Sequence, residues 1–151
     1  MKGAAALAGM LALGAASCAS AKPPAADPNL RCTFTHPATS VHTLKALPVW
    51  LRGYIHDQIG PMADAGETFN ATDVVSKPAP FNRFIRGGKI GAYWYIWFEH
   101  GGFASWRQID VVAPPNAGGR ATLADTTNRL DGPTMCTTTD RIVGKLLHGK
   151  R

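Results

Sequence analysis

The chain has 151 residues, with 16 basic and 10 acidic side chains and a formal net charge of +6. This length suits one domain that buries a single hydrophobic core. Because the basic residues are scattered, the charge forms no clustered patch of the kind that nucleic-acid binding requires, and we expect no nucleic-acid partner.

The first 21 residues have the pattern of a secretory signal. Lys2 is followed by an uncharged stretch rich in Ala and Leu, and Ala19 and Ala21 are the small residues that signal peptidase reads. The apolar stretch is shorter than the about 20 residues that a membrane-spanning helix needs. The sequence therefore predicts export to the periplasm or the medium, with residues 1–21 removed; the alternative is an Ala-rich tail without a targeting role.

A lipoprotein signal is a second interpretation of the same segment. Residues 15–18 resemble the lipobox of bacterial lipoproteins, although Ala15 stands where that motif prefers Leu. Processing would then remove residues 1–17 and place a lipid on Cys18, the only membrane contact that we expect. In either case residues 22–30, rich in Pro and Ala, are expected to form a flexible linker.

Two cysteines remain once Cys18 is removed or lipidated. An oxidising compartment would join Cys32 to Cys136, which lie at opposite ends of the expected domain. Closing a loop of about 100 residues stabilises a fold by roughly 4–5 kcal/mol in the chain-entropy treatment. The alternative is two separate buried thiols.

The first half of the domain contains one clear helix signal. Residues 31–35 alternate polar and apolar side chains and predict a short strand, followed by a loop over residues 36–40. Residues 48–59 carry apolar side chains at helical spacing, with Pro48 at the first position and Gly60-Pro61 as the stop. Residues 61–80 are expected to be a connector with a short strand at residues 73–75.

Three antiparallel strands are predicted next, over residues 81–86, 91–100 and 103–112. Glycine pairs favour tight turns at residues 87–89 and 101–102. A two-residue turn at Gly101-Gly102 would place Phe98 opposite Ser105 and Trp97 opposite Trp106. One face would then be a mostly apolar core face, and the other would mix large aromatics with polar groups.

The last third predicts a fourth strand at residues 120–124, a turn at residues 131–133, and a helix from an N-cap at Thr139 to Gly149. The expected fold class is α+β, a small antiparallel meander of three to five strands with two short amphipathic helices packed on it. It would occupy residues 31–149 as one globular domain.

The mixed face of the meander is the candidate binding surface. Large aromatics beside polar groups suit the stacking of sugar rings, or a contact with a protein. We therefore expect a non-enzymatic binding or structural module of the cell envelope, with an envelope protein or glycan as partner. The alternative is that a helix covers this face as a second core layer. The candidate residues are Tyr93, Tyr95, Trp97 and Trp106, with Arg107 and Glu99 at the margin.

A small hydrolase or lyase acting on a cell-wall polymer is the alternative function. Glu99 and His100 would supply acid–base chemistry, although neighbouring strand residues point to opposite faces. The five histidines show no metal-binding spacing and no Cys-x-x-Cys occurs, so we expect no metal and no cofactor.

Overall fold

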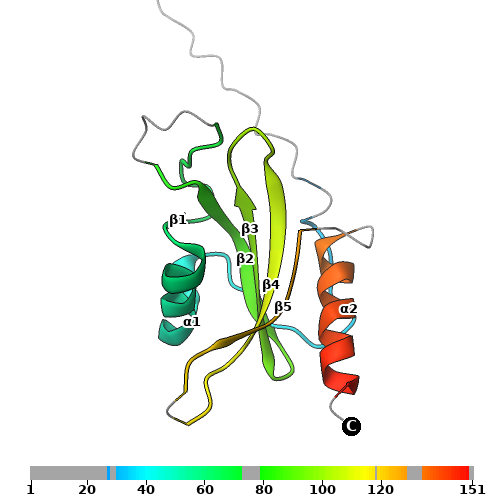
Figure 1. The fold of residues 1–151 in the computed structure, drawn as a ribbon. Helices are drawn as coiled ribbons and strands as arrows, with labels where there is room; N and C mark the ends of the chain where they lie inside the picture. Colours follow the sequence, from blue (N-terminus) through cyan, green and yellow to red (C-terminus); the bar gives the residue numbers. More distant parts are fainter. Residues whose placement is uncertain (1–26, 28–29, 73–78, 118, 129–133, 150–151) are drawn as a thin grey trace, which may run out of the picture.

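The structure, a computed structural model, describes residues 27, 30–72, 79–117, 119–128 and 134–149. The leader, Cys18, most of the linker, the expected strand at residues 73–75 and the expected turn at residues 131–133 lie outside these ranges. The described part is a five-stranded sheet in the order β1-β2-β3-β4-β5, with helical segments on its two sides (Figure 1). The predicted α+β fold is confirmed.

Four strands make the antiparallel meander: β2 (Asn82–Ile90), β3 (Tyr93–His100), β4 (Trp106–Ala113) and β5 (Thr122–Thr127). A fifth, β1 (Met62–Ala63), pairs in parallel with the start of β2. The sequence did not predict β1, because two residues are too few for an alternating pattern. The fourth predicted strand lies two to three residues further along the chain than expected.

The predicted turn at Gly87-Gly88-Lys89 is wrong. Both glycines lie inside β2, and the chain reverses at Gly91-Ala92 instead, where Gly91 has a φ of 57°. Residues 38–41 run antiparallel along the edge of β2. A Cβ on Gly88 would lie 1.9 Å from the carbonyl oxygen of Thr39, so this position requires glycine for close approach.

The predicted register of the next hairpin is also wrong. Phe98 lies opposite Gln108 and Trp97 opposite Ile109, a shift of three residues that exchanges the two faces of β4. The connection spans five residues, because Gly101 packs against the backbone of Asn70: a Cβ there would lie 1.8 Å from the Asn70 carbonyl oxygen. Gly101 is thus needed for close approach and not for a two-residue turn.

The predicted helix over residues 48–59 is confirmed as two continuous helical segments. These are α1 (Val49–Tyr54) and a wider π-type turn, η2 (Ile55–Ile59), after a short 3-10 turn, η1 (Leu44–Ala46). Pro48 caps the start rather than occupying the first turn, and Gly60, with a φ of 95°, ends the helix. Leu51, Tyr54 and Ile55 are buried, so one side of the helix packs on the sheet.

Helix α2 (Met135–His148) begins earlier than predicted, because Thr134 rather than Thr139 is its N-cap and accepts a hydrogen bond from the backbone N–H of Thr137. The hydroxyls of Thr138 and Thr139 donate to carbonyls one turn back, at Thr134 and Met135. Threonines that satisfy their hydroxyls in this way are accommodated inside a helix. The predicted end at Gly149 is confirmed.

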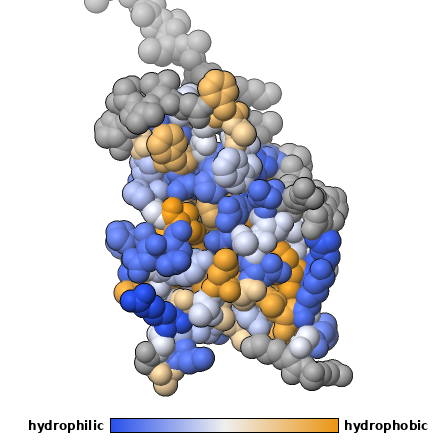
Figure 2. Space-filling model, viewed as in Figure 1, coloured by the Kyte–Doolittle hydropathy of each residue, from blue (hydrophilic) through white to orange (hydrophobic). Residues whose placement is uncertain are grey.

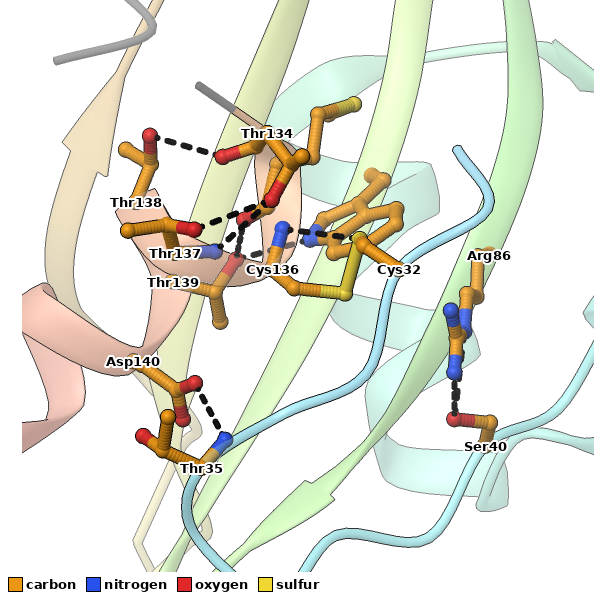
Figure 3. Close-up of a disulfide and its surroundings, with 12 residues drawn as sticks. Cys32, Thr35, Ser40, Arg86, Thr134, Cys136, Thr137, Thr138, Thr139 and Asp140 are labelled. Atoms are coloured by element: carbon orange, nitrogen blue, oxygen red, sulfur yellow. Dashed lines mark hydrogen bonds between the residues drawn. A yellow bond between two sulfur atoms is a disulfide. The ribbon is translucent and has the colours of Figure 1, made fainter. Parts of the chain in front are cut away.

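The predicted strand at residues 31–35 is wrong, since these residues form an irregular segment that contacts helix α2. The backbone N–H of Thr35 donates to the Asp140 carboxylate at 2.6 Å, which replaces a strand partner. Phe34 packs on the rings of Tyr95 and Trp97. The predicted disulfide between Cys32 and Cys136 is confirmed and joins this segment to α2 (Figure 3).

Both faces of the sheet are covered, each by its own hydrophobic cluster. The side covered by α2, here the α2 face, includes Tyr93, Tyr95, Trp97, Ile109 and Val111. The opposite side, the α1 face, includes Phe84, Ile96, Phe98 and Val112 with Leu51 and Tyr54 of α1. Because β3 is buried on both sides, its sequence is apolar almost throughout rather than alternating.

Candidate functional site

The predicted aromatic surface is divided between the two faces. Tyr93, Tyr95 and Trp97 lie under α2 with exposed fractions of 4%, 0% and 0%. Trp106 lies on the α1 face and is 42% exposed, because the hairpin register differs from the predicted one by an odd number of residues. For the first three residues the alternative holds: a helix covers them as core. In Figure 2 apolar side chains form separate patches among polar ones.

Glu99 and Arg107 lie opposite each other on the α2 face, at the end of the β3–β4 hairpin. Glu99 accepts a hydrogen bond from Nε of Arg83 at 2.6 Å, and Arg107 forms an ion pair with Asp27. An open pocket of about 410 Å³ adjoins them. Both charges are therefore compensated within the chain.

A larger pocket, of about 500 Å³, lies on the α1 face between the helical segment and β3, β4 and β5. We call it the His100 pocket. Its walls combine apolar side chains with amides, hydroxyls, a carboxylate and an imidazole. The lining residues are Tyr54, Gln58, Ile59, Phe98, His100, Gln108, Asp110, Ala121, Thr122, Leu123 and Thr126.

Asp110 is the most buried charged group of the pocket, with an exposed fraction of 3%. Its carboxylate accepts hydrogen bonds from Nε2 of Gln108 at 2.8 Å and from the hydroxyl of Thr126 at 2.6 Å. Burial, and then the charge of Asp110 and its hydrogen bond with the Tyr54 hydroxyl, raise the pKa of Tyr54 to about 12. Tyr54 is therefore protonated at neutral pH, and the hydrogen bonds from Gln108 and Thr126 stabilise the buried carboxylate.

The orientation of Gln108 fixes the role of His100. Since the amide nitrogen of Gln108 donates to Asp110, its Oε1 faces Nε2 of His100 at 3.1 Å. An amide oxygen only accepts, so Nε2 of His100 carries a proton and donates it to Gln108. The network thus runs from Asp110 through Gln108 to an imidazole at the pocket wall.

Aromatic packing holds the His100 ring in place. The ring lies 4.5 Å from Trp106 at an interplanar angle of 31°, and 5.1 Å from Phe98. Trp106 is therefore a half-exposed aromatic surface beside His100, and it lines the pocket of about 410 Å³ rather than the His100 pocket. A flat ring beside oriented hydrogen-bonding groups suits a ligand with an apolar face and polar edges.

His100 and Glu99 do not share a site. They point to opposite faces of β3, as expected of neighbouring strand residues, and Glu99 is held by Arg83. The sequence missed Tyr54, Gln108 and Asp110 as partners of His100. The sequence does show that Gln108 and Asp110 share one face of β4, because they are two positions apart. Placing that face beside His100, however, requires knowing that five residues connect the two strands.

The chain matches no family model, no curated protein and no solved structure.

Within the described ranges, no cluster of three His, Cys, Asp or Glu side chains is arranged to hold a metal ion. The same part of the chain contains no helix with the length and apolar character needed to span a bilayer.

Proposed function

We propose that this chain is an exported binding module whose His100 pocket takes a sugar unit of a cell-envelope glycan. The observation that carries the proposal is the His100–Gln108–Asp110 network at one pocket, with the half-exposed ring of Trp106 packed on His100 beside it. Trp106 itself lines the pocket of about 410 Å³ together with Glu99 and Arg107. Sugar rings present an apolar face for stacking and hydroxyls for paired hydrogen bonds. The His100 pocket offers the hydrogen-bonding groups, and Trp106 beside His100 offers the flat ring.

The bonding within the pocket favours binding over catalysis. The carboxylate of Asp110 already accepts hydrogen bonds from Gln108 and Thr126, and Tyr54 retains its proton far above neutral pH. Acid–base catalysis on a glycan needs two groups that exchange protons at one bond. Of the lining side chains other than Tyr54, only His100 and Asp110 are of a type used for such proton exchange, and Asp110 is buried and held by Gln108 and Thr126, so the hydrolase or lyase alternative lacks its second residue.

Export is supported by two independent features. The first 21 residues have the order of a secretory signal, and the disulfide of Cys32 with Cys136 is typical of oxidising compartments. We place the protein in the periplasm or the medium, with lipid anchoring at Cys18 as the alternative. Intact mass of the mature protein distinguishes cleavage before Lys22 from a lipid on Cys18, and full-length cytosolic protein with free thiols would contradict export.

The binding proposal is tested by NMR titration of the ¹⁵N-labelled mature protein with N-acetylglucosamine, its soluble oligomers and glucose. We expect saturable shifts at Gln108, Gln58 and the Trp106 indole with at least one probe. Trp106→Ala should weaken binding about tenfold or more, since stacking contributes on the order of 1–3 kcal/mol. The matched control is Phe103→Ala at the tip of the same hairpin, where the side chain is 96% exposed.

Two results would contradict this function. One is the absence of saturable shifts at the pocket with every sugar, and the other is equal binding by the Trp106→Ala and Phe103→Ala variants. Cleavage of the soluble oligomers during the titration, abolished by His100→Ala, would instead establish the enzymatic alternative.

A further inference from the structure

An open hollow of about 670 Å³ with basic side chains in its lining lies on the side of the disulfide. We call it the Arg86 hollow. Its lining contains three basic side chains and two threonines, and none of the described residues that line it is acidic. The lining residues are Leu30, Arg31, Cys32, Thr33, His42, Arg86 and Thr134.

A β-bulge directs Arg86 to this position. The pairing of β2 with β3 shifts between Phe84 and Arg86, so that Arg86, and not Ile85, lies opposite Trp97. Without the bulge Arg86 would point to the α1 face by simple alternation. Bulges are frequent next to functional sites, where they re-aim a side chain.

Arg86 is held by hydrogen bonds but has no countercharge among the residues that the structure describes. Its Nε and Nη2 both donate to the single hydroxyl oxygen of Ser40, at 3.1 and 2.6 Å (Figure 3). Its guanidinium lies 5.1 Å from the ring of Phe34 and 5.2 Å from that of Trp97. A guanidinium has five N–H donors, so this arrangement leaves donors for a further acceptor.

Comparison with two other arginines of the sheet shows what Arg86 lacks. Arg83 pairs with Glu99, and Arg107 pairs with Asp27. Within the described ranges Arg86 has no carboxylate within ion-pair distance, although it is only partly exposed. A partly buried cation normally has an anionic partner, because desolvation of an unpaired charge is costly.

The surroundings raise the positive potential further. Arg31 and His42 line the same hollow, and so does Thr134, the N-cap of the 14-residue helix α2. The N-terminal end of a helix carries a partial positive charge, which adds to that of the side chains. The hydroxyl of Thr33 is an additional donor, whereas that of Thr134 is bonded to Thr137.

We infer that the Arg86 hollow binds an oxyanion, the phosphate or carboxylate group of a small molecule, with Arg86 as the bidentate anchor and Arg31 as the second cation. Planar guanidinium donors match the oxygen spacing of both groups. This site is separate from the His100 pocket, since it lies on the α2 face.

The test is a titration of ¹⁵N-labelled mature protein with inorganic phosphate and with acetate, at constant ionic strength set by chloride. We expect the Nε–Hε signal of Arg86 to shift saturably with at least one of the two anions. The anion that binds more tightly identifies the group. A shift with phosphate alone, with acetate alone, or with both supports the site.

Three variants give the matched comparison. Arg86→Met should abolish saturable binding, and Arg31→Gln should weaken it about threefold to tenfold, since it removes one partly solvated cation. Arg52→Gln, on the exposed side of α1, should bind as the wild type does. If Arg86→Met does not fold, Arg31→Gln still decides, because Arg31 is exposed. The inference is overturned if neither anion shifts Arg86 beyond the effect of chloride, or if Arg31→Gln binds like Arg52→Gln.

Discussion

The indole Nε1 of Trp97 donates a hydrogen bond of 2.9 Å to the hydroxyl of Thr139, across the contact between β3 and α2. Both side chains are fully buried. The same hydroxyl donates to the carbonyl of Met135, so it satisfies two polar groups at once. The large aromatic residue that seemed suited to a surface is therefore tied to the inside of the fold.

Replacing Thr139 by Val should destabilise the protein by about 1–3 kcal/mol, because the indole N–H of Trp97 would lose its acceptor in a buried site. Thr139→Ser keeps the hydroxyl and should cost less. Urea unfolding at neutral pH measures both. Equal losses for the two variants would mean that the methyl group, and not the hydrogen bond, stabilises this contact.

Removing the disulfide should have a large effect on stability. Cys32 and Cys136 are 104 residues apart, and the loss of so long a loop closure corresponds to about 4–5 kcal/mol. The double variant Cys32→Ser/Cys136→Ser should therefore unfold at much lower urea concentration than the oxidised wild type. The wild type in a reducing agent is the control, and it should approach the stability of the double variant. An unchanged midpoint would contradict the prediction.

Two glycine substitutions should act in opposite directions. Gly88→Ala would place a methyl group 1.9 Å from the Thr39 carbonyl oxygen, so the edge segment must move, and we expect a loss of several kcal/mol. Gly53→Ala, inside α1 with no atom within 4 Å of the new Cβ, should stabilise the protein by about 0.5–1 kcal/mol. Thermal unfolding of the two variants side by side measures the difference.

Asp140 should make the protein sensitive to acid. Burial alone would raise the pKa of this carboxyl, but hydrogen bonds from Thr35 and His36 outweigh it and lower the pKa below the ordinary value of 3.8. The stabilisation is therefore present above pH 3.8 and is lost as pH falls through the lower value of the folded state. Asp140→Asn should be less stable than the wild type at pH 6, and the gap should narrow below about pH 4.

The control for this titration is Asp57→Asn, at a carboxylate that is 66% exposed. Its difference from the wild type should be small at every pH, because exposed pairs contribute little. A gap between wild type and Asp140→Asn that stays constant down to pH 2 would contradict the assignment.

The raised pKa of Tyr54 should make the protein less stable at alkaline pH. Its folded pKa of about 12 lies above the ordinary 10.0, so its contribution to stability is complete below pH 10 and is lost as pH rises toward 12. Tyr54→Phe removes both the titration and one donor to Asp110. The stability difference between wild type and variant should therefore shrink above pH 10, as followed by near-ultraviolet circular dichroism in urea.

Local signals in the sequence were sufficient for the helix of residues 48–59, because its apolar spacing, Pro48 and Gly60 all lie within one short segment. They were also sufficient for the existence of β2, β3, β4 and β5 and for the fold class, but not for β1, and they wrongly predicted a strand at residues 31–35. They failed at Gly88 and Gly101, since both positions require glycine because the backbone of a residue distant in sequence, Thr39 or Asn70, packs against them. A glycine in a tight turn and a glycine under a crossing backbone look the same in one sequence.

The candidate site was predictable only in part for the same reason. His100 and Trp106 were recognised, but a hairpin connection two residues long would have put them on opposite faces. Tyr54 lies on the side of a helix that the apolar spacing predicts to pack on the sheet. That it would lie beside Asp110 could not be predicted, because this depends on the register of β4. Arg86 was not recognised, since a bulge leaves no signature in the alternation of a strand that is interrupted by two glycines.

The position of α2 at the end of the described chain has a consequence for the order of events in the cell. Until residues 135–148 have been synthesised, Tyr95 and Trp97 lack their contacts with α2, and the described residues 30–34 cover this side only in part. A nascent chain of all five strands thus exposes a wide apolar sheet surface, which is prone to aggregate. The Cys32–Cys136 disulfide likewise closes only after Cys136 has been synthesised, so this bond forms at a late stage of folding.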